Sequence, residues 1–404
     1  MRILIANDGI SDVGGVQAYL EAVIAALEAR GHALAFAYCS DSGTSEAGGV
    51  FRRLPRFHLA GSNPGTPLDE VRRWSPDVCY SHNMHDLEIE SGLGAIAPVV
   101  KFMHGYFGTC ISGLKMHAFP RPVACDRTFG PSCAALFLPR RCGRLSPLAL
   151  VGGWRWARAQ RSAFDAYAAM VVASEHMRRE YVRHGCEATR VHVNALFPTC
   201  AGDAGVSAAP GDPHVVFLGR MTTLKGGDLL IRAVDRARSR LGRSIRLTMI
   251  GDGPQRPGWE ALAGRLRVPC TFTGWVSGAD RWTLVRDGSL IALPSLWPEP
   301  FGLVGLEAGA LGVPAVAMDV GGICQWLTDG VNGVAVAPPA TDIRFGDALA
   351  SLLGDPARLS ALRAGAHRIA REMTLAAHVD RLEPILQTSS KAMILTEASF
   401  FSAV

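Results

Sequence analysis

The stretch LIALPSLWPEPFGLVGLEAGAL, residues 290–311, contains the pattern of a strand, a loop and a helix in succession. Its first four residues are apolar, which favours a short buried strand. Prolines at 298 and 300 then interrupt regular structure and predict a loop. Small and apolar residues from 302 to 311 favour a helix. Two carboxylates, Glu299 in the loop and Glu307 on the helix, are unexpected in so apolar a segment and need an explanation.

The same alternation of short apolar runs with helix-period segments extends over the whole chain. Apolar residues at 16, 19, 20, 23, 24 and 27 form one face of a predicted helix. Helices are likewise expected at 228–241 and 303–311. Repeated strand and helix units of this kind predict an α/β fold with doubly wound parallel sheets. Strands are expected at 2–6, 34–39, 78–81, 99–103, 170–174, 215–218, 245–250, 270–273, 290–293 and 314–317.

The length of 404 residues exceeds what one hydrophobic core usually serves, so two domains are expected. A turn-rich segment at 199–213 is the predicted linker. It separates an N-terminal Rossmann-like domain, 1–198, with an insert at about 106–150, from a C-terminal Rossmann-like domain, 214–375. A helix and tail at 376–404 are expected to pack back towards the N-terminal domain. The two domains are expected to face a central cleft, because ligands of open α/β folds bind at the carboxyl ends of the strands.

Composition excludes several classes of protein. Hydrophobic residues make up 48% of the chain and charged residues 19%, which argues against extensive disorder. No apolar run reaches the roughly 18 residues that a membrane-spanning helix requires. The N-terminus turns polar after five residues, which is too short for a signal peptide. A cytoplasmic location is therefore expected, with possible peripheral contact at the inner face of the membrane.

Two loops contain residues suited to binding phosphate. Gly14 and Gly15 precede the first helix, where free amides and close backbone approach favour a diphosphate, although a plain turn explains them equally well. Their spacing is not Gly-x-Gly-x-x-Gly, which disfavours a nicotinamide dehydrogenase. Arg220 and Lys225 follow the strand at 215–218, and both cations can reach one diphosphate. A solvated basic loop is the alternative for this pair.

The opening stretch places two acids near opposite ends of an elongated ligand. Glu299 precedes the helix, and Glu307 lies about 12 Å further along at about 1.5 Å per residue. The amides of Gly302, Leu303 and Val304 fall at the positive end of the helix, where a phosphate can dock. Helix capping by Glu299 is the alternative, but it leaves Glu307 unexplained.

These motifs, in this order and spacing, resemble the retaining nucleotide-sugar glycosyltransferases of GT-B fold, the glycosyl transferases group 1 family. The resemblance covers roughly residues 214 to 375. The N-terminal half fits more loosely, and Asn194 alone is carried over where many relatives have Pro-Asn-Gly-Val-Asp. The motifs that carry it are Glu299 to Glu307 with Phe301-Gly302, Gly219-Arg220 to Lys225-Gly226, Gly251-Asp252-Gly253-Pro254, Phe272-Thr273-Gly274, Gly321-Gly322 and Asp329-Gly330 to Asn332-Gly333, with Gly14-Gly15, His82, His104-Gly105, Ser174-Glu175 and Asn194 before them.

The resemblance implies a role for each matching residue. Glu307 is expected to bind the ribose hydroxyls, and Glu299 the hydroxyls of the donor sugar. Arg220 and Lys225 are expected to stabilise the departing diphosphate. His104 is expected to approach the donor sugar, although a lone histidine before glycine is often structural. The remaining residues expected to contact the donor are Gly14, Gly15, Gly251, Phe301, Gly302, Leu303 and Val304.

The resemblance also implies transfer of a sugar from a nucleotide diphosphate donor, with retained anomeric configuration and without metal or cofactor. UDP-sugars are more common donors in the family than GDP-sugars. The acceptor, a glycan, a lipid-linked molecule or a small molecule, is expected to bind the N-terminal domain. A role in polysaccharide or glycoconjugate synthesis is expected. A nucleotide-sugar epimerase and a non-catalytic binding protein are the alternatives. Burial of the two acids in salt bridges would be a sign of the binding protein.

The insert raises two further hypotheses. Cys110, Cys125, Cys133 and Cys142, with His117, suggest a metal or a redox bridge, but their spacing lacks Cys-x-x-Cys pairs and favours a core or loop role. Between 115 and 161 there are nine Lys or Arg against one acid, Asp126, with Trp154 and Trp156 among the arginines. This region could contact an anionic membrane or an anionic acceptor, or be a plain solvated surface. No recognition motif accompanies the charge, which disfavours nucleic acid.

Overall fold

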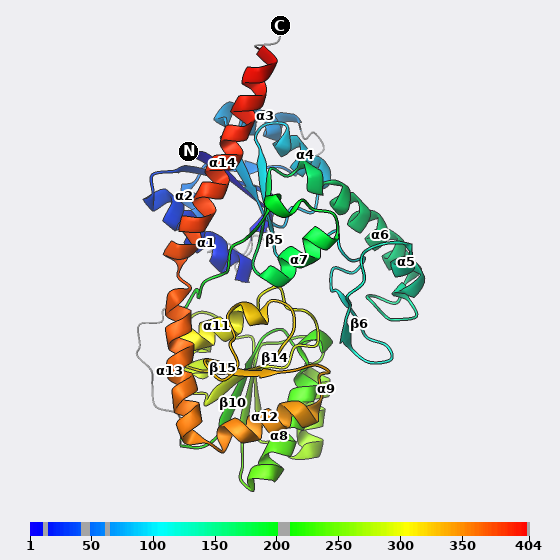
Figure 1. The fold of residues 1–404 in the computed structure, drawn as a ribbon, viewed down its shortest axis with the longest axis vertical. Helices are drawn as coiled ribbons and strands as arrows, with labels where there is room; N and C mark the ends of the chain where they lie inside the picture. The colour runs from blue at the N-terminus through cyan, green and yellow to red at the C-terminus, as the bar shows by residue number, and fades with distance from the viewer. Residues whose placement is uncertain (11–14, 42–48, 61–64, 201–210, 402–404) are drawn as a thin grey trace. The chain divides into compact units, whose positions relative to one another are not determined.

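The computed structural model describes residues 1–10, 15–41, 49–60, 65–200 and 211–401. The chain forms two compact α/β units (Figure 1). Unit 1 contains residues 1–114, 127–195 and 375–404, and unit 2 contains residues 115–126 and 196–374. Each unit is built around its own parallel sheet.

The sheet of unit 1 has seven parallel strands in the order β3-β2-β1-β4-β5-β8-β9. Its central strands are buried along their whole length because both faces of the sheet are covered. The strand order reverses between β1 and β4, which pair from Ile3 with Val78 to Ala6 with Ser81. The strands are β1 (Arg2–Ile10), β2 (Ala33–Asp41), β3 (Arg56–His58), β4 (Val78–Ser81), β5 (Val99–Met103), β8 (Ala169–Val172) and β9 (Val191–Val193).

Helices connect the strands of unit 1. In α1 the buried residues Leu20, Val23, Ile24 and Leu27 form one stripe that packs on the sheet. The C-terminal helix α14 lies against α1 (Figure 1). The helices are α1 (Gly15–Ala29), α2 (Gly49–Arg53), α3 (Gly65–Trp74), α4 (Leu87–Gly94), α5 (Pro131–Phe137), α6 (Pro147–Ser162), α7 (Glu175–Arg183) and α14 (Leu375–Phe401).

The sheet of unit 2 has six parallel strands in the order β12-β11-β10-β13-β14-β15. Here the order reverses between β10 and β13, which pair through Val215 with Leu290 and Val216 with Ile291. The strands are β10 (His214–Leu218), β11 (Arg246–Ile250), β12 (Cys270–Gly274), β13 (Leu290–Leu293), β14 (Ala315–Met318) and β15 (Gly333–Val336). Unit 2 also contains a two-stranded antiparallel hairpin, β6 (Met116–His117) with β7 (Val123–Ala124).

The helices of unit 2 enclose one apolar core. α8 packs against both α12 and α9, and α11 packs against α13. Phe217, Trp259 and Phe345 are the large aromatic side chains of this core. The helices are α8 (Gly227–Leu241), α9 (Arg256–Leu266), α10 (Asp280–Arg286), α11 (Leu303–Ala310), α12 (Asp342–Leu353) and α13 (Pro356–Glu372).

The predicted fold class is confirmed: both halves are Rossmann-like α/β units with parallel sheets. The strands expected at 78–81, 99–103 and 290–293 have the predicted bounds. One expectation was wrong: residues 7–10 are not a loop, because β1 continues to Ile10 and pairs there with β2. Gly14 and most of the predicted linker lie outside the described residues. Among the described residues, no helix is long and apolar enough to cross a membrane.

Candidate functional site

The predicted donor-side residues of unit 2 lie where its strand order reverses. Arg220 and Lys225 follow β10, and Glu299 follows the neighbouring strand β13. At a point where the strand order reverses, the loops that follow the two neighbouring strands separate from each other. They leave room for a ligand at the carboxyl ends of the strands. The three side chains therefore belong to the position where open α/β sheets bind their ligands.

Lys225 and Glu299 form a close ion pair. The Nζ atom of Lys225 lies 2.6 Å from Oε1 of Glu299, and the hydroxyl of Ser295 donates to the same oxygen at 2.5 Å. Glu299 is buried, whereas 30% of the Lys225 side chain is exposed. No described residue donates a hydrogen bond to Oε2 of Glu299, so this oxygen can accept a hydrogen bond from a hydroxyl group of a ligand.

Two glycines allow the loops of this site to approach each other. Gly226 has φ +64°, and a Cβ atom there would lie 2.2 Å from the carbonyl oxygen of Pro294. Gly251 has φ +123°, and a Cβ atom there would lie 2.2 Å from the carbonyl oxygen of Gly219. Any other residue would push these backbones apart. The glycines therefore position the backbone on either side of Arg220 and Lys225.

Arg220 differs from Lys225 in having no partner. Its side chain is exposed, and no described residue forms a hydrogen bond or ion pair with its guanidinium group. A free guanidinium presents a planar set of donors that matches the oxygens of a phosphate. Of the two predicted cations, Arg220 is thus the one available without breaking an existing contact.

The loop that follows β13 ends at the N-terminus of α11. Gly302 caps this helix with φ +76°, and no side chain accepts a hydrogen bond at the cap. Glu299 is therefore not a helix cap, and that alternative is wrong. Phe301 is buried, and its carbonyl oxygen accepts a hydrogen bond of 2.8 Å from Nε1 of Trp326. The amides of Leu303 and Val304 lie in the first turn, where the helix dipole favours anions.

Glu307 lies on the second turn of α11 and is 5% exposed. The hydroxyl of Thr199 donates to its Oε1 at 2.6 Å, and Cys200 donates to its carbonyl oxygen at 3.4 Å. Burial raises the pKa of the Glu307 carboxyl, and the hydrogen bond from Thr199 and the charge of Arg281 oppose this rise. No ion pair among the described residues involves Glu307, so its carboxylate remains able to exchange Thr199 for a ligand hydroxyl.

His104 of unit 1 belongs to a pair of neutral imidazoles. It follows β5, and its Nε2 lies 3.0 Å from Nδ1 of His82, which follows β4. Loss of hydration, with a smaller effect of Lys101, lowers the pKa of His104 to about 3. The pKa of His82 is also lowered, chiefly by burial and then by His104. His104 is thus a neutral donor or acceptor of hydrogen bonds near pH 7.

The histidine pair should make the protein sensitive to acid. Because both folded-state pKa values lie below the ordinary value of 6.5, the unfolded chain binds protons first as the pH falls. Stability is present above about pH 6.5 and is lost below it, by at most about 1.4 kcal/mol per pH unit for each histidine. Urea denaturation of the wild type and of His104→Asn should show a shallower loss in the variant. Equal slopes would contradict this origin of acid sensitivity.

A second polar network lies close to the histidine pair in unit 1. The Tyr19 hydroxyl lies 2.7 Å from the Tyr80 hydroxyl and 2.8 Å from Nε2 of His378. Asn194, the residue carried over by the resemblance, is fully buried and donates to the carbonyl oxygen of His378 at 3.1 Å. Asn194 thus holds α14 through His378. The residues around Asn194 in the sequence did not predict this contact.

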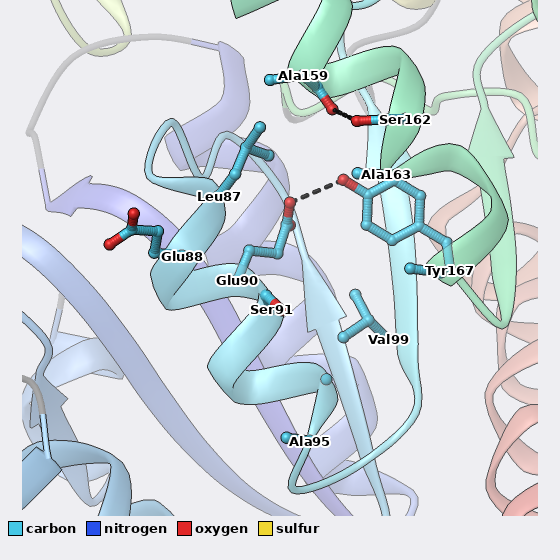
Figure 2. A pocket seen from close by; sticks show the side chains of 12 residues that line it. Leu87, Glu88, Glu90, Ser91, Ala95, Val99, Ala159, Ser162, Ala163 and Tyr167 are labelled. Carbon is cyan, nitrogen blue, oxygen red and sulfur yellow. Dashed lines mark hydrogen bonds between the residues drawn. The ribbon is translucent and has the colours of Figure 1, made fainter.

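Unit 1 also contains an open cavity of about 840 Å³ between α4 and α6 (Figure 2). At its base, the Tyr167 hydroxyl donates to Oε2 of Glu90 at 2.8 Å, as Figure 2 shows. Lys101 donates to Oε1 of Glu90 at 2.5 Å, and Ser81 donates to the same oxygen. Both carboxylate oxygens are satisfied, so this ion pair stabilises unit 1 and offers nothing to a ligand.

The cysteine hypothesis for the insert is not supported. No disulfide joins the described cysteines, and no cluster of metal-binding side chains occurs in the part of the chain that the structure describes. Cys133 and Cys142 instead pack beside a small apolar cluster of Ile111, Phe129 and Phe137. Cys133 and Cys142 therefore contribute to packing in the insert, and the core or loop role of Cys110 and Cys125 stays a prediction.

The basic region predicted at 115–161 is divided between the two units. Residues 115–126 belong to unit 2 and the rest to unit 1, and Lys115 is buried. Trp154 packs on Phe129 with ring centroids 4.7 Å apart, and Trp156 packs on Phe107 at 5.3 Å. The two tryptophans are partly buried and contribute to packing within unit 1.

Two contacts at the candidate site were missed by sequence reasoning. Ser295 binds Glu299, and Thr199, at the edge of the predicted linker, binds Glu307. Both are small hydroxyl residues beside turns, a setting in which serine and threonine commonly serve the local backbone. Only the position of Ser295 four residues before Glu299 could have suggested its contact.

Known proteins resemble this chain in both halves. Residues 204–371 match the family described as Glycosyl transferases group 1, and residues 13–194 match Glycosyltransferase Family 4. D-inositol 3-phosphate glycosyltransferase of Nocardia farcinica is 39% identical over 177 residues, which are 41% of this chain and 39% of the relative. Alpha-D-kanosaminyltransferase of Streptomyces kanamyceticus is 33% identical over 216 residues, which are 50% of this chain and 55% of that relative. The chain thus spans about 40 to 55% of the length of these relatives.

A solved structure extends the likeness to the whole fold. The Anabaena protein HepE in complex with UDP matches with a TM-score of 0.67 at 18% identity, over 96% of this chain and 100% of its own. The two Rossmann-like units therefore define a protein of the GT-B fold. The C-terminal half of the chain is thus similar to the group 1 glycosyltransferases, and the N-terminal half to the family 4 glycosyltransferases.

Proposed function

We propose that this protein transfers a sugar from a nucleotide diphosphate sugar to an acceptor hydroxyl, with retention of anomeric configuration and without a metal ion. The observation that carries the proposal is the grouping of Arg220, Lys225 and Glu299 after adjacent strands at the switch point of unit 2. Two cations there can neutralise the charge that develops on a departing diphosphate. Retention, metal independence and a role in polysaccharide or glycoconjugate synthesis remain predictions.

The roles of the individual residues follow from their surroundings. Arg220, which is exposed and has no partner among the described residues, binds the diphosphate first. Lys225 stabilises the negative charge of the diphosphate while its ammonium group stays close to Glu299. The Oε2 atom of Glu299 accepts a hydrogen bond from a hydroxyl group of the donor sugar. The Glu307 carboxylate gives up its hydrogen bond from Thr199 and accepts hydrogen bonds from the ribose hydroxyls instead. The departing phosphate takes the proton of the acceptor, so no protein carboxylate has to act as a nucleophile.

The donor is proposed to carry uridine. This rests on the fold shared with HepE, whose structures contain UDP in one case and UDP-glucose in another. One relative is named for D-inositol 3-phosphate and another for a kanosaminyl group, so the proposal specifies neither the sugar nor the acceptor of this protein. The predicted binding of the acceptor by unit 1 and of the diphosphate by Gly14 and Gly15 remain part of the proposal, as does the approach of His104 to the donor sugar.

The rival classes are less well supported. A salt bridge on Glu299, the expected sign of a non-catalytic binding protein, is present, but its partner Lys225 is itself a proposed ligand of the diphosphate and is partly exposed. Glu307 has no such bridge among the described residues. The family and the relatives are glycosyltransferases, which also disfavours an epimerase.

The proposed function is tested first by nucleotide binding. One nucleotide among UDP, GDP, ADP and dTDP should raise the melting temperature of the wild type, because it binds only the folded state. We expect UDP to do so, and Glu307→Gln should lose most of the shift since the neutral amide accepts ribose protons poorly. Glu372→Gln, an exposed glutamate of α13, is the matched control and should respond like the wild type. If no nucleotide shifts the wild type, the donor site assigned to unit 2 is wrong.

The location of the enzyme is part of the same proposal. We propose peripheral contact with an anionic membrane through the basic segment of unit 1, at 127–161, which contains no acidic residue. A cytoplasmic site of action stays a prediction. Contact with a membrane would bring the enzyme to acceptors held in it.

A further inference from the structure

One helix of unit 1 exposes an unusual apolar face. Leu148 is 84% exposed and Val151 is 51% exposed, both on α6, and Leu145, just before the helix, is 62% exposed. The opposite side of the helix is buried through Ala157 and Gln160. Large apolar side chains with comparable exposure are few in the described ranges, and three of them lie between 145 and 151. Such clustering indicates an interaction surface.

The same face is strongly cationic. Spacings of three and four residues place Leu148, Val151, Arg155 and Arg158 in one row along α6. Arg155, Arg158 and the preceding Arg144 are exposed, and none forms an ion pair with any described residue. The segment 127–161 contains no aspartate or glutamate. The apolar residues therefore lie between Arg144 on one side and Arg155 on the other.

We infer that this row, together with Arg144 and Leu145 just before the helix, is the surface that docks on an anionic membrane. The inference rests on the proposed membrane contact and assigns it to particular residues. Interfacial helices combine aliphatic side chains that enter the boundary of headgroups and acyl chains with cations that bind lipid phosphates. Nucleic acid would use the arginines but would leave Leu148 in water, so it fits this row less well.

The geometry limits the size of the contact. From Leu148 to Arg158 the row extends about 15 Å, at about 1.5 Å per residue. Beyond Arg158 the helix borders the cavity of Figure 2, whose lining also includes the carboxylate of Glu88 of α4. The cationic row ends there. The contact is therefore short, and its affinity should depend on both the apolar and the charged residues.

Vesicle sedimentation tests the inference without any measurement of glycosyl transfer. The wild type should bind vesicles that contain phosphatidylglycerol and be released by salt, and it should bind pure phosphatidylcholine vesicles poorly. The double variant Leu148→Gln with Val151→Gln should bind roughly tenfold or more weakly, because it loses two aliphatic side chains from the interface. Arg155→Gln with Arg158→Gln should bind roughly thirtyfold more weakly at low salt.

The matched control is Ile343→Gln with Arg232→Gln, which removes an exposed apolar residue and an exposed arginine from unit 2. It should bind vesicles like the wild type. The inference is overturned if the wild type ignores phosphatidylglycerol, if both vesicle types bind equally, or if the Leu148 and Val151 variant keeps full binding. Nucleotide-induced thermal shifts should be unchanged in the α6 variants. Vesicle binding without a nucleotide response would therefore refute the donor site alone.

Discussion

Replacing Arg220 by alanine is expected to lower the turnover number about a hundredfold, the effect of removing roughly 3 kcal/mol of transition-state stabilisation. The side chain is exposed and lacks a partner among the described residues, so folding does not depend on it. The loss should appear in turnover more than in donor affinity, because negative charge on the diphosphate grows as the glycosidic bond breaks. The measurement is the rate of nucleotide release from the donor that the nucleotide screen selects.

Two further variants make the Arg220 result specific. Arg220→Lys keeps the charge but loses the forked donors, so we expect only partial recovery of turnover. Arg232→Ala removes another exposed arginine of unit 2, on α8, and should leave turnover unchanged. All three proteins should melt within about a degree or two of the wild type, since surface changes usually alter stability by less than about 0.5 kcal/mol. An Arg220→Ala enzyme with normal turnover would end the assignment of this residue to the diphosphate.

Replacing Lys225 by methionine is expected to have two separable effects. Turnover should fall about a hundredfold, because one of the two cations that we propose bind the diphosphate is lost. Stability should fall as well, because the buried Glu299 carboxylate loses the ammonium group at 2.6 Å. Breaking a fully buried pair costs about 3–5 kcal/mol, and the 30% exposure of Lys225 reduces this to about 1–2 kcal/mol. Urea denaturation and steady-state kinetics measure the two effects independently.

A double-mutant cycle separates folding from catalysis at this pair. Adding Glu299→Gln to Lys225→Met removes the unpaired charge and should recover most of the lost stability, but turnover should stay low because both ligand contacts are gone. The exposed pair Arg368 and Glu372 is the control, and its variants should change stability by less than about 0.5 kcal/mol. If the double variant regained turnover together with stability, the pair would be structural and the proposed roles would fail.

The local sequence pattern was sufficient to predict most strands and helices and to select the candidate site residues. The apolar run at 290–293 and the glycine at 302 predicted the bounds of β13 and the start of α11, because burial period and backbone freedom are properties of neighbouring residues. The motifs around Arg220, Lys225 and Glu299 also indicated one family from local sequence, because each motif is a short loop that directly follows a strand. The strand β1 was predicted too short because Asn7, Asp8 and Gly9 interrupt its apolar run, although its pairing with β2 continues to Ile10.

The contacts of those residues were decided by tertiary structure. Lys225 and Glu299 are 74 positions apart, and they meet because β10 and β13 are neighbours in the sheet although two strands separate them in the chain. Trp154 and Trp156 look exposed among arginines in sequence, but the packing of α6 buries them partly and turns Leu148 and Val151 outward. A sequence determines which side chains can be buried or charged. Strand order and helix rotation determine which partner each one finds, because these depend on contacts between residues far apart in the chain.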